Sequence, residues 1–140
     1  MYRIFPSPKH CTFYHNTLSC TSYGTVTTAP EIEESCRAAG FDPSTLLAAV
    51  FPGGFSPEGI TLTAEYVSCA PEGFQLNIAP SGIRISCGDG AGFFYALGVL
   101  VQLAAQADGA LPCAEIADEP ALSVRGIMLD IGRDKIPSME

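Results

Sequence analysis

The sequence predicts an α+β fold, with a mixed, mainly antiparallel β-sheet and helices packed on one face of it. Residues 60–66 and 73–78 alternate apolar and polar side chains with period two, which indicates half-buried strands. Residues 91–107 form a long apolar segment that suits a helix lying on such a sheet. Because 47% of its 140 residues are hydrophobic, the chain can bury a core of its own.

The first 50 residues predict two short strands followed by two short helices. A proline-rich, extended lead-in over residues 3–14 ends in the first strand, and the threonine-rich residues 24–28 form the second. Residues 31–39 follow a proline and carry acidic side chains in their first turn, which favours a helix start. Asp42 is expected to cap the second helix, over residues 46–50.

A β-hairpin, a long helix and a last extended segment are expected in the second half of the chain. Pro80-Ser81-Gly82 makes a tight turn between two alternating segments, so residues 73–87 predict an antiparallel hairpin. Asp89 can cap the helix over residues 91–107, and residues 111–116 are extended. The helix stripe expected to lie on the sheet consists of Phe93, Phe94, Leu97, Leu100, Val101 and Ala104.

The sequence also predicts a domain boundary near its end. Residues 1–118 form the domain, and residues 119–140 form a linker and the first strand of another domain, because Asp118-Glu119-Pro120 is a polar break. Residues 124–131 are almost continuously apolar, as in a parallel strand covered on both faces. No later residues of this sequence could cover the two faces of this strand. We therefore expect that the chain is an amino-terminal domain truncated just after the first strand of a second domain. An uncovered strand 124–131 would favour self-association.

Composition and charge exclude several classes of partner. Fifteen acidic against seven basic residues leave a net charge of −8, which repels phosphate backbones and anionic lipid surfaces. Neither nucleic acid nor a membrane is therefore expected as a partner. No run reaches the ~18 to 20 apolar residues of a membrane span, and the segment after Met1 lacks a signal-peptide pattern. We expect a cytoplasmic protein.

Neither the cysteines nor the histidines predict a metal site. No two of the six cysteines have the spacing of a thiolate zinc pair, so they are expected to be reduced and mostly buried. His10 and His15 lie five residues apart, whereas two helical zinc ligands need a spacing of four. No metal and no other cofactor is expected. The cysteines are Cys11, Cys20, Cys36, Cys69, Cys87 and Cys113.

Four segments in order carry a family resemblance. They are the hairpin 71–85, the helix start 91–103, the connector 112–120 and the strand 125–133. Together they resemble glycoside hydrolase family 20, the β-N-acetylhexosaminidases, where a non-catalytic, zincin-like domain runs into a (β/α)8 barrel. The likeness covers residues 71–135, while the first 70 residues match only in the order of elements.

The resemblance implies a parent enzyme that removes terminal N-acetylhexosamine from glycans. Arg133 matches the family arginine that binds the hydroxyls of the terminal sugar, and a guanidinium offers several donors for that purpose. Asp130 is expected to be a buried structural carboxylate. The family's catalytic Asp-Glu pair would follow Glu140, so this chain by itself is expected to hold no catalytic residue and to be inactive.

Two other functions remain open at this point. The domain could be a stand-alone carbohydrate-binding or protein-interaction module, with Tyr2, Phe5, Phe13 and Tyr14 stacking on sugar rings. It could also precede the barrel of an O-GlcNAcase-like or α-glucuronidase-like glycosidase. The residue types at positions 129–133 argue against the O-GlcNAcase-like alternative.

Overall fold

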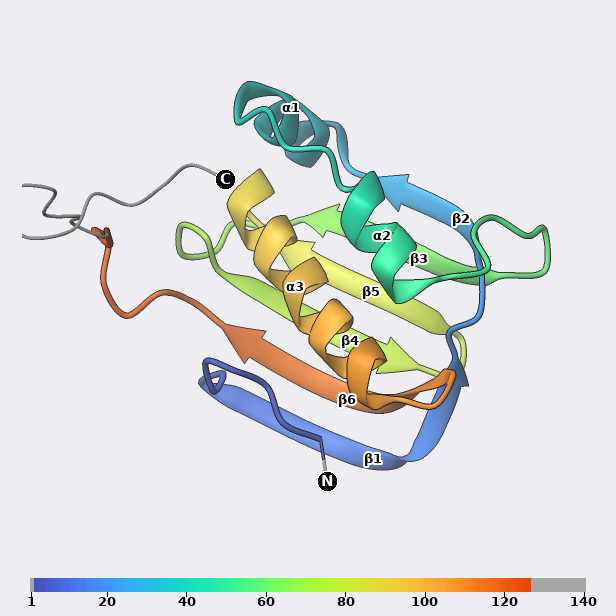
Figure 1. Ribbon diagram of the computed structural model, residues 1–140. Coiled ribbons are helices and arrows are strands. Elements are labelled where there is room, and N and C mark those ends of the chain that lie inside the picture. Colours follow the sequence, from blue (N-terminus) through green and yellow to red (C-terminus); the bar gives the residue numbers. More distant parts are fainter. Residues whose placement is uncertain (1, 127–140) are drawn as a thin grey trace, which may run out of the picture.

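The computed structural model describes residues 2–126, and residues 1 and 127–140 lie outside this description. In the described residues, six strands form one sheet in the order β1-β6-β4-β5-β3-β2 (Figure 1). The strands are β1 (His10–Ser19), β2 (Tyr23–Thr28), β3 (Ile60–Tyr66), β4 (Phe74–Ala79), β5 (Gly82–Cys87) and β6 (Ala110–Asp118). The helices are α1 (Pro30–Ala38), α2 (Ser44–Val50) and α3 (Gly90–Gln106).

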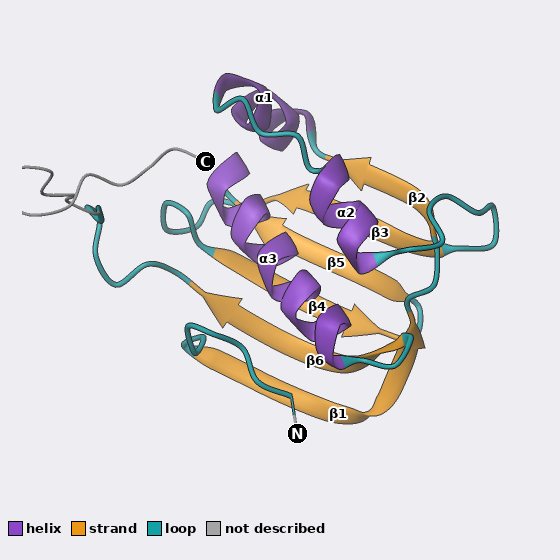
Figure 2. Ribbon diagram, viewed as in Figure 1, coloured by secondary structure: helices purple, strands orange, loops and turns teal. Residues whose placement is uncertain are grey.

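The sheet is mixed and mainly antiparallel, as predicted. β1 pairs with β6, β6 with β4, and β4 with β5, all antiparallel, whereas β5 with β3 and β3 with β2 are parallel. The parallel pair β2 and β3 needs a crossover, and α1 and α2 lie within it. All three helices cover the same face of the sheet (Figure 2), which confirms the predicted α+β fold.

The β4-β5 hairpin forms where the sequence predicts it. Leu76 faces Ile85 and Ile78 faces Ile83 across the two strands, and all four side chains are buried. The turn ends at Gly82, whose φ of 138° lies in a region that other residues rarely adopt. The buried side chains of this hairpin form the centre of the apolar surface on which α3 packs.

The first strand is longer than predicted. It begins at His10 and continues to Ser19, with an irregular register between Phe13 and Thr17. β1 is an edge strand, and nearly all of its side chains are exposed, so no apolar alternation marks its full length. Asp42 also departs from its predicted role. Its carboxylate accepts the backbone N–H of Ser44 at 2.9 Å, while the position before α2 is Pro43.

Helix α3 lies on the sheet with a different stripe from the predicted one. Its buried side chains are Phe93, Ala96, Leu97, Val99, Leu100 and Leu103. Phe94 is 43% exposed, so placing it on the sheet was wrong, whereas Val101 and Ala104 are partly buried and pack against the core. The helix has no charged residue and carries apolar side chains on more than one side, so periodicity does not identify the side that faces the core.

Asp89 caps α3, as predicted, and also holds a neighbouring turn. One carboxylate oxygen accepts the N–H of Gly92 at 2.7 Å, and the other accepts the N–H of Glu72 at 2.8 Å. Glu72 has a φ of 61°, in the left-handed region that non-glycine residues seldom occupy. The same side chain thus fixes the start of α3 and the turn that leads into β4.

Four of the six cysteines are buried, as predicted, and Cys11 and Cys69 are exposed. Burial raises the pKa of the Cys87 thiol to about 12, and the nearby Cys69 and Asp89 add to the shift. His10 and His15 are exposed residues of β1. Within residues 2–126, no helix combines the length and apolar content needed to cross a bilayer.

We predict that Asp89→Ala lowers the free energy of unfolding by about 1 to 2 kcal/mol, because two backbone N–H groups lose their acceptor. Asp89→Asn keeps one acceptor oxygen and should lose about half as much. Urea unfolding followed by circular dichroism measures both. Asp108→Ala, an exposed acid after α3, is the matched control, and an Asp89→Ala loss no larger than this control would contradict the dual role.

We also predict that iodoacetamide at mildly alkaline pH modifies Cys11 and Cys69 but leaves Cys87 intact in the folded chain. The raised pKa keeps Cys87 as the unreactive thiol, and burial excludes the reagent. Peptide mass spectrometry identifies the modified residues, and denaturant should expose all six. Equal modification of Cys87 and Cys69 in the native chain would show that the β5 end is not packed as described.

Candidate functional site

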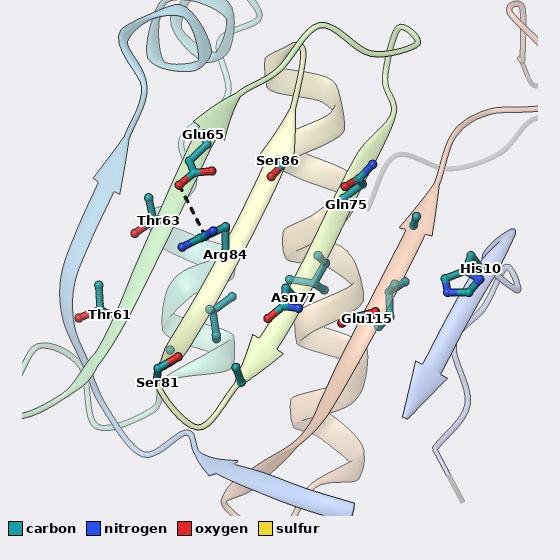
Figure 3. Close-up of a pocket in the computed structure, with 16 residues that line it drawn as sticks. His10, Thr61, Thr63, Glu65, Gln75, Asn77, Ser81, Arg84, Ser86 and Glu115 are labelled. Carbon is teal, nitrogen blue, oxygen red and sulfur yellow. Dashed lines mark ion pairs between the residues drawn. The ribbon is translucent and has the colours of Figure 1, made fainter. Parts of the chain in front are cut away.

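The open face of the sheet carries a hollow of about 860 Å³ (Figure 3). Its polar side chains come from adjacent strands and alternate with the core residues. Examples are Glu65 of β3, Arg84 of β5, Asn77 of β4 and Glu115 of β6. Water can reach this face because all three helices lie on the other side of the sheet.

The groups on the open face do not form a catalytic arrangement. Glu65 pairs with Arg84 at 3.5 Å, and both side chains are well exposed. Glu65 and Glu115 are three strand spacings apart, roughly 14 Å, whereas a pair of glycosidase carboxylates lies about 5 to 9.5 Å apart. Within residues 2–126, no group of three metal-ligating side chains comes together. We interpret this face as the solvated side of the sheet.

The outward side of α3 presents an apolar surface that residues 2–126 cover only in part. We call it the α3 outer face, formed by Ala91, Phe94, Gly98, Val101 and Ala105 at spacings of three and four. Helix α3 contains no charged residue. Phe94 packs edge-on against Phe41 at 5.1 Å between ring centroids and remains partly exposed. An apolar helix face is normally buried, so this face suits contact with another protein surface.

A second hollow, of about 380 Å³, lies beside this face. Its walls are residues 4–9, helix α3 and residues 118–125, and apolar side chains predominate. The N–H groups of Arg3 and Phe5 donate to the side chains of Gln106 and Gln102, at 2.8 and 2.7 Å. The amino-terminal segment is thereby fixed along α3 (Figure 1).

The segment after β6 is attached to the domain at two points. Lys9 binds Glu119 through its ammonium group at 2.8 Å, and its N–H donates to Asp118 at 3.2 Å. Arg125 donates to the carboxylate of Glu72 and, at 3.3 Å, to the hydroxyl of Tyr95 on α3. Residues 118–125 are therefore held on the helix side of the molecule.

The site residue predicted from sequence, Arg133, lies outside the described residues, as does Asp130. Of the predicted strand 124–131, residues 124–126 are described and are not in a strand, and the rest lies outside. Glu33 and Glu34 lie on α1, and Asp118 and Glu119 bind Lys9. These acidic pairs thus occupy a helix start and a linker, where they were predicted.

The four aromatic residues considered for sugar stacking do not form one platform. Tyr2 and Phe13 pack together with ring centroids 5.7 Å apart, on the helix side. Tyr14 follows Phe13 in β1 and points to the opposite face. Partial desolvation and the nearby Glu115 raise the pKa of its hydroxyl. Phe5 belongs to the amino-terminal segment.

Sequence analysis missed the contacts of Arg125. The three partners Glu72, Tyr95 and Arg125 come from a turn, a helix and a linker, and no spacing pattern connects them. Glu72 and Arg125 are 53 residues apart in the chain.

A family model described as glycosyl hydrolase family 20, domain 2, matches residues 1–119. A β-hexosaminidase of Akkermansia muciniphila is 33% identical over 72 residues, which are 49% of this chain and 15% of the relative. A β-hexosaminidase of Vibrio vulnificus is 28% identical over 131 residues, which are 94% of this chain and 15% of the relative. The chain thus spans about 15% of the length of either relative.

A solved structure has the same fold. It is a GH20 exo-β-N-acetylglucosaminidase of Vibrio harveyi in complex with N-acetylglucosamine. The TM-score is 0.62 at 17% identity, over 84% of this chain and 19% of the other. At this identity, the likeness shows the fold alone.

Proposed function

Because the chain belongs to the domain 2 family of glycosyl hydrolase family 20, we propose that it serves as the amino-terminal accessory domain of a β-hexosaminidase. The observation that carries this proposal is the family match over residues 1–119, which include every strand and helix described here. Because the relatives are several times longer than this chain, we propose that the catalytic residues lie in the rest of a longer parent protein.

For the parent, we propose removal of terminal N-acetylhexosamine from glycans. The names of the two curated relatives and the N-acetylglucosamine bound to the Vibrio harveyi enzyme support this substrate class. Arg133 is proposed to hydrogen-bond the hydroxyls of that sugar, since a guanidinium holds its charge at any working pH. Residues 119–140 are proposed to contain the linker and the first strand of a (β/α)8 barrel.

The domain's own role is proposed to be structural. The α3 outer face is uncharged and apolar, and residues 118–125 are held on the same side of the sheet. A catalytic domain that follows this linker would meet the α3 outer face first and remove it from water. The open sheet face, with its exposed Glu65–Arg84 pair, would stay solvated.

A stand-alone carbohydrate-binding module is less well supported, because the exposed aromatic residues lie on two faces of the sheet. The family match favours family 20 over the O-GlcNAcase-like and α-glucuronidase-like alternatives. Self-association of the isolated chain remains a proposal. A second copy of this chain could bury the exposed Val124 side chain and the apolar α3 outer face.

We predict that the parent protein cleaves an aryl N-acetyl-β-glucosaminide and that residues 1–140 alone do not. In the parent, Arg133→Ala should lower kcat/KM about ten- to a hundred-fold, because charge-assisted bonds to the sugar are lost. Lys135→Ala, a neighbouring cation, is the control and should change little. Cleavage by purified residues 1–140 would contradict the proposed division of labour.

We also predict that Ala105→Arg affects the parent but not the isolated domain. Ala105 is exposed on α3, so in residues 1–140 the change should stay within about 0.5 kcal/mol of unfolding free energy. In the parent, the added charge would be buried against the catalytic domain and should lower the melting temperature by several degrees. Gln75→Arg adds the same charge to the open face. Equal shifts for both variants in the parent would contradict docking through α3.

A further inference from the structure

We propose that Glu72 and Tyr95 form a clasp for Arg125 and that this clasp sets the direction in which the chain leaves the domain. Its purpose in the parent rests on the proposed function, but its existence is a property of residues 2–126. Arg125 is a positioning residue in this proposal. It would act on the catalytic domain through the linker and would not touch substrate.

The contacts of Arg125 come from three different parts of the structure. One terminal nitrogen donates to the carboxylate of Glu72 and, at 3.3 Å, to the hydroxyl of Tyr95. The other donates to the carbonyl of Leu122 at 2.5 Å. A guanidinium presents its donors in a fixed plane, so three acceptors on a turn, a helix and the linker determine its position.

Glu72 is fixed without any contribution from Arg125. Its N–H donates to Asp89, whose other oxygen caps α3, so the turn and the helix start share one anchor. The next residue, Gly73, has no room for a side chain, because a Cβ there would lie 2.9 Å from the carbonyl oxygen of Ala70. The left-handed Glu72 and the tight Gly73 therefore fix the backbone from which the Glu72 side chain extends.

The clasp is one of two attachments of the same short segment. Lys9 holds Glu119 at the beginning of the linker, and Glu72 holds Arg125 six residues later. A segment fixed at one point can pivot, whereas a segment fixed at two points has a defined direction. Between the two attachments lies the 380 Å³ hollow, lined partly by Tyr95 and Val99 of α3. The linker is thereby aligned along the helix side of the domain.

The ion pair is partly shielded from water, with side-chain exposures of 40% for Arg125 and 29% for Glu72. The hydrogen bonds that the Arg125 guanidinium donates to Tyr95 and Glu72 raise its pKa. By contrast, Glu65 and Arg84 on the open face are 45% and 66% exposed and lie 3.5 Å apart. That pair provides a matched control, because it has the same charges in a more solvated place.

Trypsin cleaves after arginine, so the bond between Arg125 and Gly126 reports directly on the clasp in residues 1–140. We expect Glu72→Ala to increase the rate of this cleavage about two- to five-fold, the range of a partly exposed ion pair. Tyr95→Phe should give a smaller increase. Glu65→Ala, on the opposite face, should leave the rate unchanged. Mass spectrometry of the 1–125 product measures all three rates.

A folding defect is separated from loss of the clasp by hydrogen exchange. In Glu72→Ala, the amides of β4 and β5 should keep their protection while those of residues 121–126 exchange faster. An unchanged cleavage rate in Glu72→Ala, or equal increases in Glu72→Ala and Glu65→Ala, would overturn the clasp. Because neither readout involves substrate, these results leave the proposed glycosidase function untouched, and an inactive parent would leave the clasp untouched.

Discussion

The carboxylate of Asp89 joins the start of α3 to the turn that leads into β4. One oxygen accepts the N–H of Gly92, which would otherwise have no partner in the first turn of α3. The other oxygen accepts the N–H of the left-handed Glu72. The first contact sets where the long apolar helix begins on the sheet. The second sets where the Glu72 carboxylate meets Arg125. This partly buried carboxylate thus helps to set both the helix face that another domain could cover and the path of the linker.

The two sides of the sheet differ in a way that suits an accessory domain. The open face alternates polar residues with the core and needs no further cover. The helix side remains incomplete, because α3 is apolar on its outer side as well as its inner side. Domains that work alone usually place charged side chains on such a helix face. The exposed apolar surface therefore lies on the side toward which the linker is held. A partner domain on that side fits the match to domain 2 of glycosyl hydrolase family 20.

Local patterns predicted the local structure well. The strand at residues 60–66 and the hairpin were expected from alternation and turn chemistry, and Asp89 was expected as a cap. The position of β6 between β1 and β4 could not be predicted, because pairing of distant strands leaves no local signal. Phe94 was misplaced because apolar side chains occupy more than one side of α3. The clasp was missed because Glu72 and Arg125 are far apart in the chain, and Arg133 lies outside the described residues.

The most direct test of the central claim is an experimental structure of the parent protein, with the exposed area of the α3 outer face as its measurement. This account predicts that Phe94 and Ala105 lose most of their exposure to the catalytic domain. It also predicts that Glu65 and Arg84 stay as solvated as they are here. An α3 outer face that remains open to solvent, or a catalytic domain seated on the open sheet face, would contradict the account.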